Sequence, residues 1–273
     1  MPEGPEVTII RENLNTYLKG YYLVDMKIYP NSRYRNKAPD NYLNITKSIP
    51  LKLETIVSKG KLIYWLFEKN FSMLNTLGMS GIWSKNPYKH TSIEMNFILE
   101  GKKRTVYFID TRHFGTLKFL TSKKELNDKL KLIGPDILND KSITFDLYKK
   151  RYLKYKHYNI TKAMMNQKII SGIGNYLKSE ILYDAKISPL HKIEDLTEEV
   201  LHRLFLSSKK IIEKSYKKGG LSIRDYMDME RKKGDYGFEL KVYCQDYDRF
   251  NNKVKRITTP DNRTTYWVPT VQK

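Results

Sequence analysis

The sequence has 273 residues, of which 40% are apolar, and a formal net charge of +20. This length and apolar content favour a soluble globular protein of about two domains and exclude a chain that is mostly disordered. The excess of Lys and Arg predicts a polyanionic partner, above all nucleic acid, because each neutralised phosphate releases a counterion. The alternative is a merely lysine-rich protein from an AT-rich genome, which would also explain the many Asn, Ile and Tyr residues.

The sequence predicts neither a disulfide nor a metal site. Cys244 is the only cysteine, which leaves no intramolecular disulfide and favours a reducing compartment. The five histidines are scattered, and no window supplies the four clustered Cys or His ligands of a structural zinc site. The start of the chain has no signal-peptide pattern, and no apolar run approaches the roughly 18 residues of a membrane span. We therefore expect an intracellular protein, in nucleus or cytoplasm, with no metal and no cofactor.

The N-terminal part of the chain begins with a helix and continues in β structure. Gly4-Pro5-Glu6, followed by an apolar stripe, predicts a helix that ends near Gly20. From there to about Leu120 the pattern is that of strands, seen best in the apolar run 62–67 and the alternating residues 93–99. This pattern predicts a β-sandwich or a barrel-like domain.

After Lys123 the spacing of apolar residues becomes helical, with a break at Gly134-Pro135. We expect helices at about 145–155, 160–171, 176–185 and 198–218, the last of which stops at Gly219-Gly220. Residues 241–271 are rich in Tyr, Thr and Val around Pro260-Asp261-Asn262, which predicts a β-hairpin with a polar turn.

Several short motifs follow one another along the chain. They are Met1-Pro2-Glu3-Gly4-Pro5-Glu6-Val7, Gly60-Lys61, Leu77-Gly78-Met79-Ser80-Gly81, Asp110-Thr111-Arg112-His113-Phe114-Gly115, Ser171-Gly172-Ile173-Gly174-Asn175-Tyr176, Gly219-Gly220 with Ser222-Ile223-Arg224-Asp225-Tyr226, and Arg263-Thr264-Thr265-Tyr266. Each could occur by chance, but the ordered set resembles the formamidopyrimidine-DNA glycosylase and endonuclease VIII family over almost the whole chain.

The resemblance implies an α+β multidomain fold in which duplex DNA lies in a basic cleft between two domains. We expect an N-terminal β-sandwich with flanking helices over 1–122, a linker over 123–143, a helix-two-turn-helix domain over 144–239 and a β-hairpin finger over 240–273. The implied function is that of a bifunctional DNA glycosylase and AP lyase of base excision repair. Such an enzyme flips out an oxidised base, excises it through a Schiff base and cleaves the strand by β,δ-elimination.

Pro2, Glu3, Lys61 and Arg263 are the catalytic residues that the resemblance implies. Loss of Met1 would give Pro2 a secondary α-amine, and since α-amines titrate near ~8, a fraction is neutral and nucleophilic. Its attack on the deoxyribose gives an iminium, an electron sink that permits elimination. Glu3 would donate a proton to the opening sugar, Lys61 would clamp a phosphate and share in proton transfer, and Arg263 would assist the second elimination. Each residue also has an ordinary alternative. Pro2 could simply begin the chain, and Glu3 could be a solvated carboxylate. Lys61 could be a surface lysine and Arg263 an arginine of the hairpin turn.

A base cannot be attacked inside a duplex, so the nucleotide must rotate out and the hole must be refilled. The resemblance assigns this task to Met79, Arg112 and Phe114, a flexible thioether, a planar hydrogen-bond donor and an aromatic wedge. Met79 and Phe114 could instead be core residues, but the neighbouring glycines favour turns that present them. These three residues are therefore expected to contact DNA.

Further DNA contacts are expected at the helix junction and before one strand. Gly172 and Gly174 would let backbone amides point at a phosphate, with Asn175 capping the next helix. An ordinary helix junction is the alternative. His90, which follows Lys89, resembles a DNA-contacting histidine of the family.

The sequence departs from the family pattern at several positions. The usual four-cysteine zinc finger is absent, which is similar to the zincless-finger subgroup, so packing of Tyr266 and Trp267 would hold the hairpin. Thr76 replaces a frequent histidine, and Thr161 replaces a phosphate-binding lysine, although two lysines lie close by in sequence. These two lysines are Lys156 and Lys162.

Gly4, where the formamidopyrimidine branch commonly has leucine, favours the endonuclease VIII branch. The expected substrates are then oxidised pyrimidines, hydantoins and formamidopyrimidines, in duplex DNA that also includes abasic sites, with single-stranded DNA as a further candidate. A lesion-capping loop is expected within Asp228–Phe238, and a monomer is expected. The alternatives are a non-catalytic damaged-DNA-binding protein of the same fold and an RNA-binding module, which explains neither the N-terminal motif nor the void-filling residues.

Overall fold

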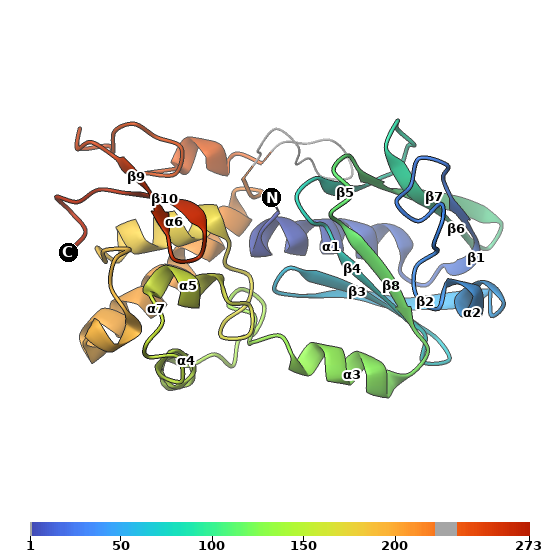
Figure 1. Cartoon of the computed structure of the whole chain (residues 1–273). Helices are drawn as coiled ribbons and strands as arrows, with labels where there is room; N and C mark the ends of the chain where they lie inside the picture. Colours follow the sequence, from blue (N-terminus) through green and yellow to red (C-terminus); the bar gives the residue numbers. More distant parts are fainter. Residues whose placement is uncertain (1, 222–233) are drawn as a thin grey trace. The chain divides into compact units, whose positions relative to one another are not determined.

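The computed structural model describes residues 2–221 and 234–273 (Figure 1). Contacts within the chain divide them into two compact units. The first unit comprises Pro2, residues 6–132, Leu221 and Gly234, and the second comprises residues 3–5, 133–220 and 235–273.

The first unit is built on an eight-stranded sheet in the order β5-β7-β6-β1-β2-β3-β4-β8, with every neighbouring pair antiparallel. Its elements are α1 (Gly4–Leu18), β1 (Tyr22–Ile28), α2 (Tyr42–Thr46), β2 (Leu51–Lys59), β3 (Leu62–Phe67), β4 (Ser72–Thr76), β5 (Gly81–Ser84), β6 (Thr91–Leu99), β7 (Lys102–Asp110), β8 (Thr116–Leu120) and α3 (Lys123–Lys131). The predicted N-terminal helix and the predicted strands 62–67 and 93–99 are thereby confirmed.

The sheet closes over an aromatic core. The ring centroid of Trp65 on β3 lies 4.9 Å from that of Trp83 on β5 and 6.3 Å from that of Phe97 on β6. Because β3 is not a neighbour of β5 or β6 in the sheet, these contacts join its two halves face to face, as in the predicted β-sandwich. Ile10 and Leu14 of α1 are buried in the same core, and each such side chain contributes roughly 1.5–3 kcal/mol when fully buried.

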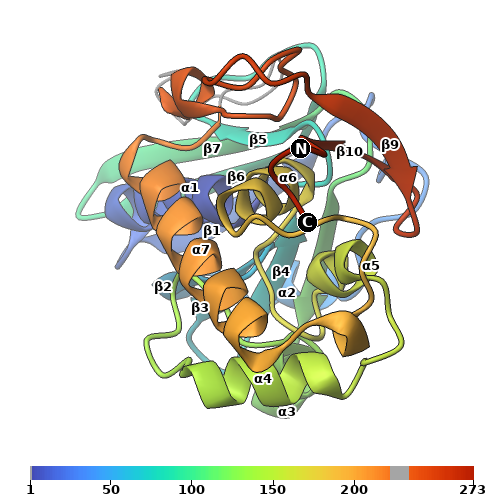
Figure 2. The same ribbon diagram turned by 90° about the vertical axis from the view of Figure 1, so that its left-hand side faces the viewer.

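The second unit consists of short helices and a β-hairpin. Its elements are α4 (Phe145–Leu153), α5 (Ile160–Met165), α6 (Asn175–Asp184), η1 (Ile193–Asp195), α7 (Glu198–Lys217), η2 (Tyr236–Glu239), β9 (Lys255–Thr259) and β10 (Arg263–Trp267). Helix α7 packs against α6 and α4, which can be followed in Figure 2. As predicted, α7 ends at Gly219-Gly220, where the Gly220 amide donates to the Ser215 carbonyl at 2.8 Å.

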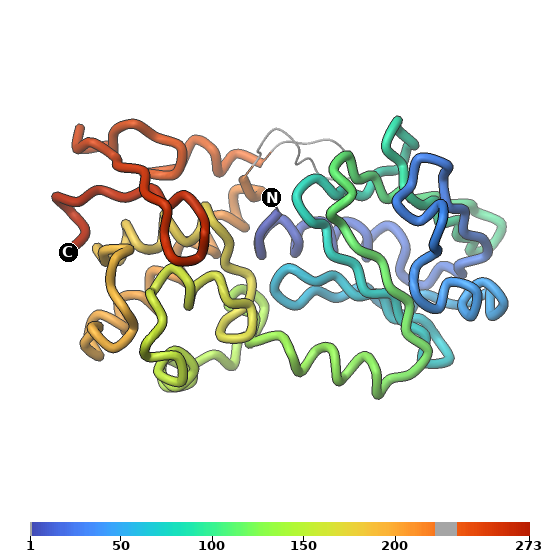
Figure 3. Tube along the Cα trace, in the orientation of Figure 1, coloured from blue at the N-terminus to red at the C-terminus, as the bar shows by residue number. Residues whose placement is uncertain are grey.

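The predicted helix 160–171 is wrong in its second half, because α5 ends at Met165. Beyond Met165, the Gln167 side chain forms hydrogen bonds with backbone groups that a continuing helix would otherwise pair. Its Nε2 donates to the carbonyls of Met165 and Ile173, at 3.0 and 2.9 Å, and its Oε1 accepts from the Gly172 amide at 3.0 Å. Helical spacing of apolar residues cannot reveal such a side-chain bridge. Figure 3 traces the backbone through this region.

The C-terminal hairpin is confirmed, but it is shorter than the segment 241–271 from which it was predicted. Arg263 pairs with Thr259 across a three-residue turn, Pro260-Asp261-Asn262, in which Asn262 adopts a φ of 58°. A positive φ in the last residue is typical of three-residue hairpin loops.

A small apolar cluster supports the hairpin. It comprises Tyr183, Val242, Val254 and Val268, with Tyr266 packed against it. Of the two aromatic residues expected to support the hairpin by packing, Tyr266 packs against this cluster and Trp267 is not part of it; valines supply most of the remainder.

No helix within the ranges 2–221 and 234–273 is long and apolar enough to cross a membrane. Those same ranges contain no group of three or more His, Cys, Asp or Glu residues arranged to hold a metal ion.

Candidate active site

Glu3 is fixed at the start of α6. Its side chain is 2% exposed, and its carboxylate accepts hydrogen bonds from the backbone amides of Gly174 at 2.7 Å, Tyr176 at 3.0 Å and Leu177 at 3.3 Å. These amides lie at the positive end of the helix and have no partner within it, so an acidic side chain stabilises them. Glu3 is therefore an oriented, buried carboxylate, which excludes the solvated first-turn role. Pro2, the preceding residue, is buried as well.

Two glycines allow this close approach. A Cβ atom on Gly174 would lie 2.2 Å from Cδ of Glu3, so any other residue would displace the carboxylate. Gly4 donates its amide to the Gly172 carbonyl at 2.9 Å, and a Cβ there would lie 3.1 Å from Cα of Gly172. The glycine at position 4, from which the endonuclease VIII branch was predicted, thus has a packing reason of its own.

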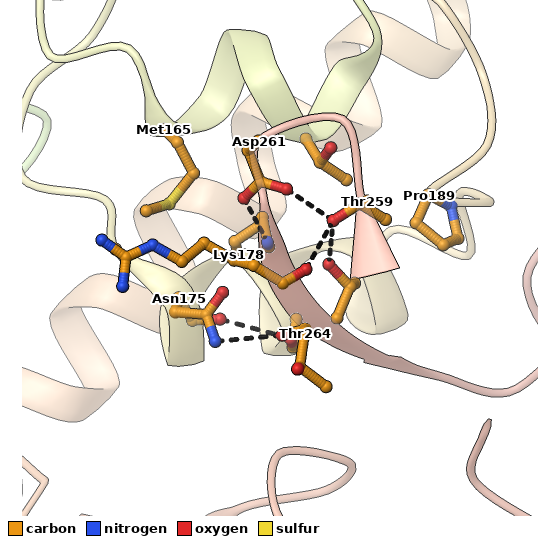
Figure 4. A network of polar contacts seen from close by, with 12 residues as sticks. Met165, Asn175, Lys178, Pro189, Thr259, Asp261 and Thr264 are labelled. Atoms are coloured by element: carbon orange, nitrogen blue, oxygen red, sulfur yellow. Dashed lines mark hydrogen bonds and ion pairs between the residues drawn. The ribbon is translucent and has the colours of Figure 1, made fainter. Parts of the chain in front are cut away.

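Asn175 does not cap α6 as predicted. Gly174 is the N-cap residue, Asn175 is the first helical residue, and the capping oxygens come from Glu3. The prediction failed because a carboxylate distant in sequence occupies the position that a local side chain would otherwise fill. The Asn175 amide instead donates to the Thr264 carbonyl on β10 at 3.0 Å (Figure 4).

Arg263 begins β10 and is exposed. Asn175 holds the carbonyl of Thr264, the residue after Arg263. The helix junction and the hairpin tip are therefore joined within the second unit. Tyr243 also contacts Asn175, and burial raises the pKa of Tyr243 to about 12, which keeps its hydroxyl protonated. The predicted residues Glu3, Asn175 and Arg263 are thus brought together on α6 and its neighbours.

Lys61 lies in the two-residue turn between β2 and β3 and is half-buried. Gly60, the first residue of the turn, has a φ of 57°, as tight hairpins of this kind require. The Gly60-Lys61 motif therefore marks a rigid hairpin that fixes the lysine backbone.

Two loops of the first unit, residues 77–81 and 110–115, pack back to back. A Cβ on Gly78 would lie 2.6 Å from the amide nitrogen of Gly115. Both loops are held by Asp110, which is 1% exposed and accepts from Ser80 Oγ at 2.7 Å and from the Gly115 amide at 2.6 Å. We call residues 77–81 and 110–115 the paired loops.

The paired loops present the residues predicted to fill a void. Met79 is half-buried in a turn, Arg112 is exposed, and Phe114 is 54% exposed. The Arg112 guanidinium lies over the Phe114 ring, 5.2 Å from its centroid. The core interpretation is therefore wrong, since Phe114 is largely exposed and Met79, half-buried in a turn, is not part of the buried cluster of this unit. His90 is adjacent, because its carbonyl accepts from the Asp110 amide at 3.1 Å.

The two threonines that replace family residues have structural roles. Thr76 shares a hydrogen bond with Thr116 across strands β4 and β8, at 2.7 Å between hydroxyl oxygens. Thr161 is buried and donates both its amide and its hydroxyl to Asn159. Lys156 and Lys162 are exposed.

Sequence reasoning missed the residues that hold these loops and the hairpin tip. Asp110 was noticed only as part of a motif, and Arg33, which donates to the carbonyls of His113 and Gly115 at 2.8 and 3.1 Å, was not noticed. Lys178 and Asp261 were also missed, although a lysine in the apolar helix 176–185 was a usable signal. The expected motif segment 222–226 and most of the expected capping loop, 228–233, lie outside the described residues.

Three family models match the chain: the formamidopyrimidine-DNA glycosylase N-terminal domain over residues 1–117, the H2TH domain over 133–227 and the C-terminal domain over 230–273. The chain is 28% identical over 249 residues to a formamidopyrimidine-DNA glycosylase of Desulfitobacterium hafniense, covering 89% of this chain and 88% of that protein. It is also 28% identical to the corresponding protein of Mycoplasmopsis pulmonis, covering 100% of this chain and 98% of the other.

A solved structure of Lactococcus lactis Fpg in complex with DNA containing an abasic site has a similar fold. Its TM-score is 0.86 at 25% sequence identity, covering 99% of each chain. Together the three family models account for nearly the whole chain in the order expected from its motifs, and the fold agrees. The chain belongs to the formamidopyrimidine-DNA glycosylase family of DNA glycosylases with AP lyase activity.

Proposed function

We propose that this protein excises oxidised bases from duplex DNA through a Schiff base on Pro2 and then cleaves the strand by β,δ-elimination. The observation that carries the proposal is the carboxylate of Glu3, which is held by three amides of the helix junction beside the nucleophile in sequence. A group that transfers a proton to a particular sugar atom must be held in one orientation, and these bonds provide it.

Pro2 would supply the nucleophile after removal of Met1. Its nitrogen attacks C1′ of the damaged nucleotide, the base leaves, and the sugar ring opens to an iminium. The iminium withdraws electrons from C2′, so a proton is lost there and the 3′ phosphate departs; a second elimination releases the 5′ phosphate. Glu3 would transfer the proton at the ring oxygen, and Lys61, on its tight hairpin, would contact the DNA backbone and share in proton transfer.

Arg263 would bind the phosphates around the lesion, since a guanidinium matches the bidentate geometry of a phosphate. Its position at an exposed hairpin tip, beside Asn175 and the α6 junction, supports this role. Asn175 would contribute a further polar contact to DNA.

Met79, Arg112 and Phe114 would refill the space that the flipped nucleotide leaves. Their support is the construction of the paired loops, which carry a thioether, a guanidinium and an aromatic ring on loops that Asp110 joins through hydrogen bonds. An apolar wedge of this type offsets part of the unstacking cost of a few kcal/mol. His90, adjacent to Asp110, would contact the DNA beside them.

We further propose that the C-terminal finger is zincless and that the favoured lesions are oxidised pyrimidines, hydantoins and formamidopyrimidines. The apolar cluster of valines and tyrosines under the hairpin supports the first point. Gly4 supports the second, although its contact with Gly172 is a packing reason of similar weight. The division into domains at residues 122, 143 and 239 belongs to the same proposal.

The test is incision of duplexes that each contain one thymine glycol, one hydantoin, one formamidopyrimidine, one 8-oxoguanine or one abasic site. The proposal predicts products that end in phosphate on both sides of the gap, with the pyrimidine and hydantoin lesions cut faster than 8-oxoguanine. Binding to these duplexes without incision of any of them would instead support a non-catalytic damaged-DNA-binding protein.

A further inference from the structure

A buried ion pair joins α6 to the tip of the hairpin. Lys178 Nζ lies 2.6 Å from Oδ2 of Asp261, and the two side chains are 0% and 4% exposed. Figure 4 shows Lys178 reaching from the helix to the carboxylate at the turn between β9 and β10. The lysine stands on the helix that Glu3 caps, and Asp261 stands two residues before Arg263.

Hydrogen bonds connect the Asp261 carboxylate to the backbone of Arg263. Oδ1 of Asp261 accepts from the Thr259 hydroxyl at 2.5 Å, and the same hydroxyl lies 3.1 Å from the Arg263 carbonyl. Since one hydroxyl carries one proton, Thr259 shares it between these two acceptors and accepts in turn from Thr265, at 2.7 Å. Every residue of this chain of bonds is on the hairpin except Lys178.

Lys178 and Asn175 hold the hairpin from the same face of α6, because residues three apart lie on one side of a helix. Asn175 binds the carbonyl of Thr264, the residue after Arg263, and Lys178 binds Asp261, two residues before Arg263. A two-stranded hairpin is only marginally stable by itself, so contacts of this kind are needed to give its tip a single position.

The charges around Lys178 fit a role close to the reacting groups. Burial lowers the pKa of Lys178, while Asp261 and Glu3 raise it and Arg263 lowers it further. The ammonium therefore interacts with the charges of both Glu3 and Arg263. A buried ion pair adds little net stability, since desolvation offsets the attraction, but it disfavours alternative arrangements that would separate the charges.

We propose that Lys178 and Asp261 are positioning residues that hold the hairpin tip so that Arg263 meets the DNA phosphates. The inference rests on the proposed role of Arg263 in strand cleavage. In this role the ion pair fixes the finger tip against the helix junction.

The test compares Lys178→Met, Asp261→Asn and the double variant, each with and without Arg263→Ala. Lys210→Met is the matched control, because Lys210 forms an ion pair with Asp184 in the same unit but is 64% exposed. Single-turnover cleavage of an abasic duplex and the midpoint of chemical denaturation are measured for each protein. We expect each single variant to slow cleavage about tenfold, and to slow it no further when Arg263 is already alanine.

The double variant separates positioning from general stability. Removal of both charges leaves no unpaired buried ion, so the denaturation midpoint should recover toward the wild-type value while cleavage stays slow. Recovery of both stability and cleavage, or losses that add to that of Arg263→Ala, would overturn the proposal.

Hydrogen exchange of the peptide that covers residues 259–265 gives a readout that does not depend on activity. Lys178→Met should speed exchange there, whereas Lys210→Met should not, and unchanged exchange in Lys178→Met would overturn the proposed positioning. If wild type and Arg263→Ala cleave equally, the proposed role of Arg263 fails instead, and the exchange data still decide whether the ion pair fixes the tip.

Discussion

The carboxylate of Glu3 accepts a hydrogen bond from the backbone amide of Gly174, at 2.7 Å, across 171 residues of sequence. This contact brings the second residue of the Pro2-Glu3 pair to the start of α6. It also explains why the N-terminal motif and the glycine motif 172–174 occur together, since each is the packing partner of the other.

Gly174→Ala should slow base excision by about 100-fold, because the new Cβ would lie 2.2 Å from Cδ of Glu3 and displace the carboxylate by roughly an ångström. Overpacking of this kind should also cost about 1–3 kcal/mol of unfolding free energy. Gly101→Ala is the control, because it strains the backbone at a φ of 75° but meets no atom within 4 Å. Equal rates of excision in the two variants would show that the position of Glu3 does not limit the reaction.

Phe114→Ala should slow excision from duplex DNA while leaving the unfolding free energy within about 0.5 kcal/mol of wild type, because the ring is largely exposed. Cleavage of an abasic site in single-stranded DNA, where no stacked partner must be displaced, should change much less. Phe250→Ala is matched to it, since Phe250 is also exposed beneath an arginine, with Arg249 4.6 Å from its ring centroid. A loss of the same size in both variants would contradict the wedge role.

Asp110→Asn should destabilise the protein by about 1–3 kcal/mol. An amide group can accept through only one of its two polar atoms, so either Ser80 Oγ or the Gly115 amide would lose its acceptor. Both paired loops should then loosen, and duplex excision should fall along with stability. Asp25→Asn, at an exposed carboxylate, is the control, and denaturation that gives equal midpoints for the two variants would refute the role of Asp110.

Stability should decrease at acid pH partly through Asp184. Burial raises the pKa of this carboxyl, but hydrogen bonds from Lys241, Lys210 and Ser207 outweigh burial and hold it below its ordinary value. A carboxyl with a lowered folded-state pKa stabilises the protein above its unfolded pKa, and this contribution is lost as pH falls through the folded value.

Asp184→Asn should therefore cost about 2 kcal/mol near neutral pH. The cost should shrink progressively below about pH 4, where the carboxyl takes up its proton in the unfolded state before it does so in the folded state. Denaturation of the two proteins from pH 7 to pH 3 measures this. Asp246→Asn, which removes an exposed partner of Arg256, should show little difference at any pH. A difference in unfolding free energy between wild type and Asp184→Asn that stays constant across this pH range would contradict the proposed contribution of the Asp184 carboxylate.

Sequence patterns predicted helices, strands and turns well where neighbouring residues alone decide the structure. The apolar run after Gly60-Lys61 predicted a strand at its observed bounds, Leu62–Phe67, and Gly219-Gly220 predicted the end of α7. The turn at Pro260-Asp261-Asn262 was likewise evident from its residue types.

Contacts between residues far apart in sequence could not be predicted in this way. Glu3 replaces the local cap that was expected of Asn175, and the Gln167 side chain ends the helical region earlier than its spacing indicated. Lys178 finds its partner 83 residues later, in a turn whose sequence gives no sign of it. The residues to which we assign chemical roles came from ordered motifs, whereas the contacts that hold Glu3 and the hairpin tip in place became visible only in the structure.

The central claim, that the amine of Pro2 is the nucleophile, is tested most directly by borohydride reduction of the protein on a duplex with one abasic site. The trapped complex is digested, and mass spectrometry locates the residue linked to the sugar. Our account predicts a link to the α-nitrogen of Pro2 in a peptide that has lost Met1. A link to the side chain of Lys61 or another lysine, or binding of the duplex with no trapped complex, would contradict it.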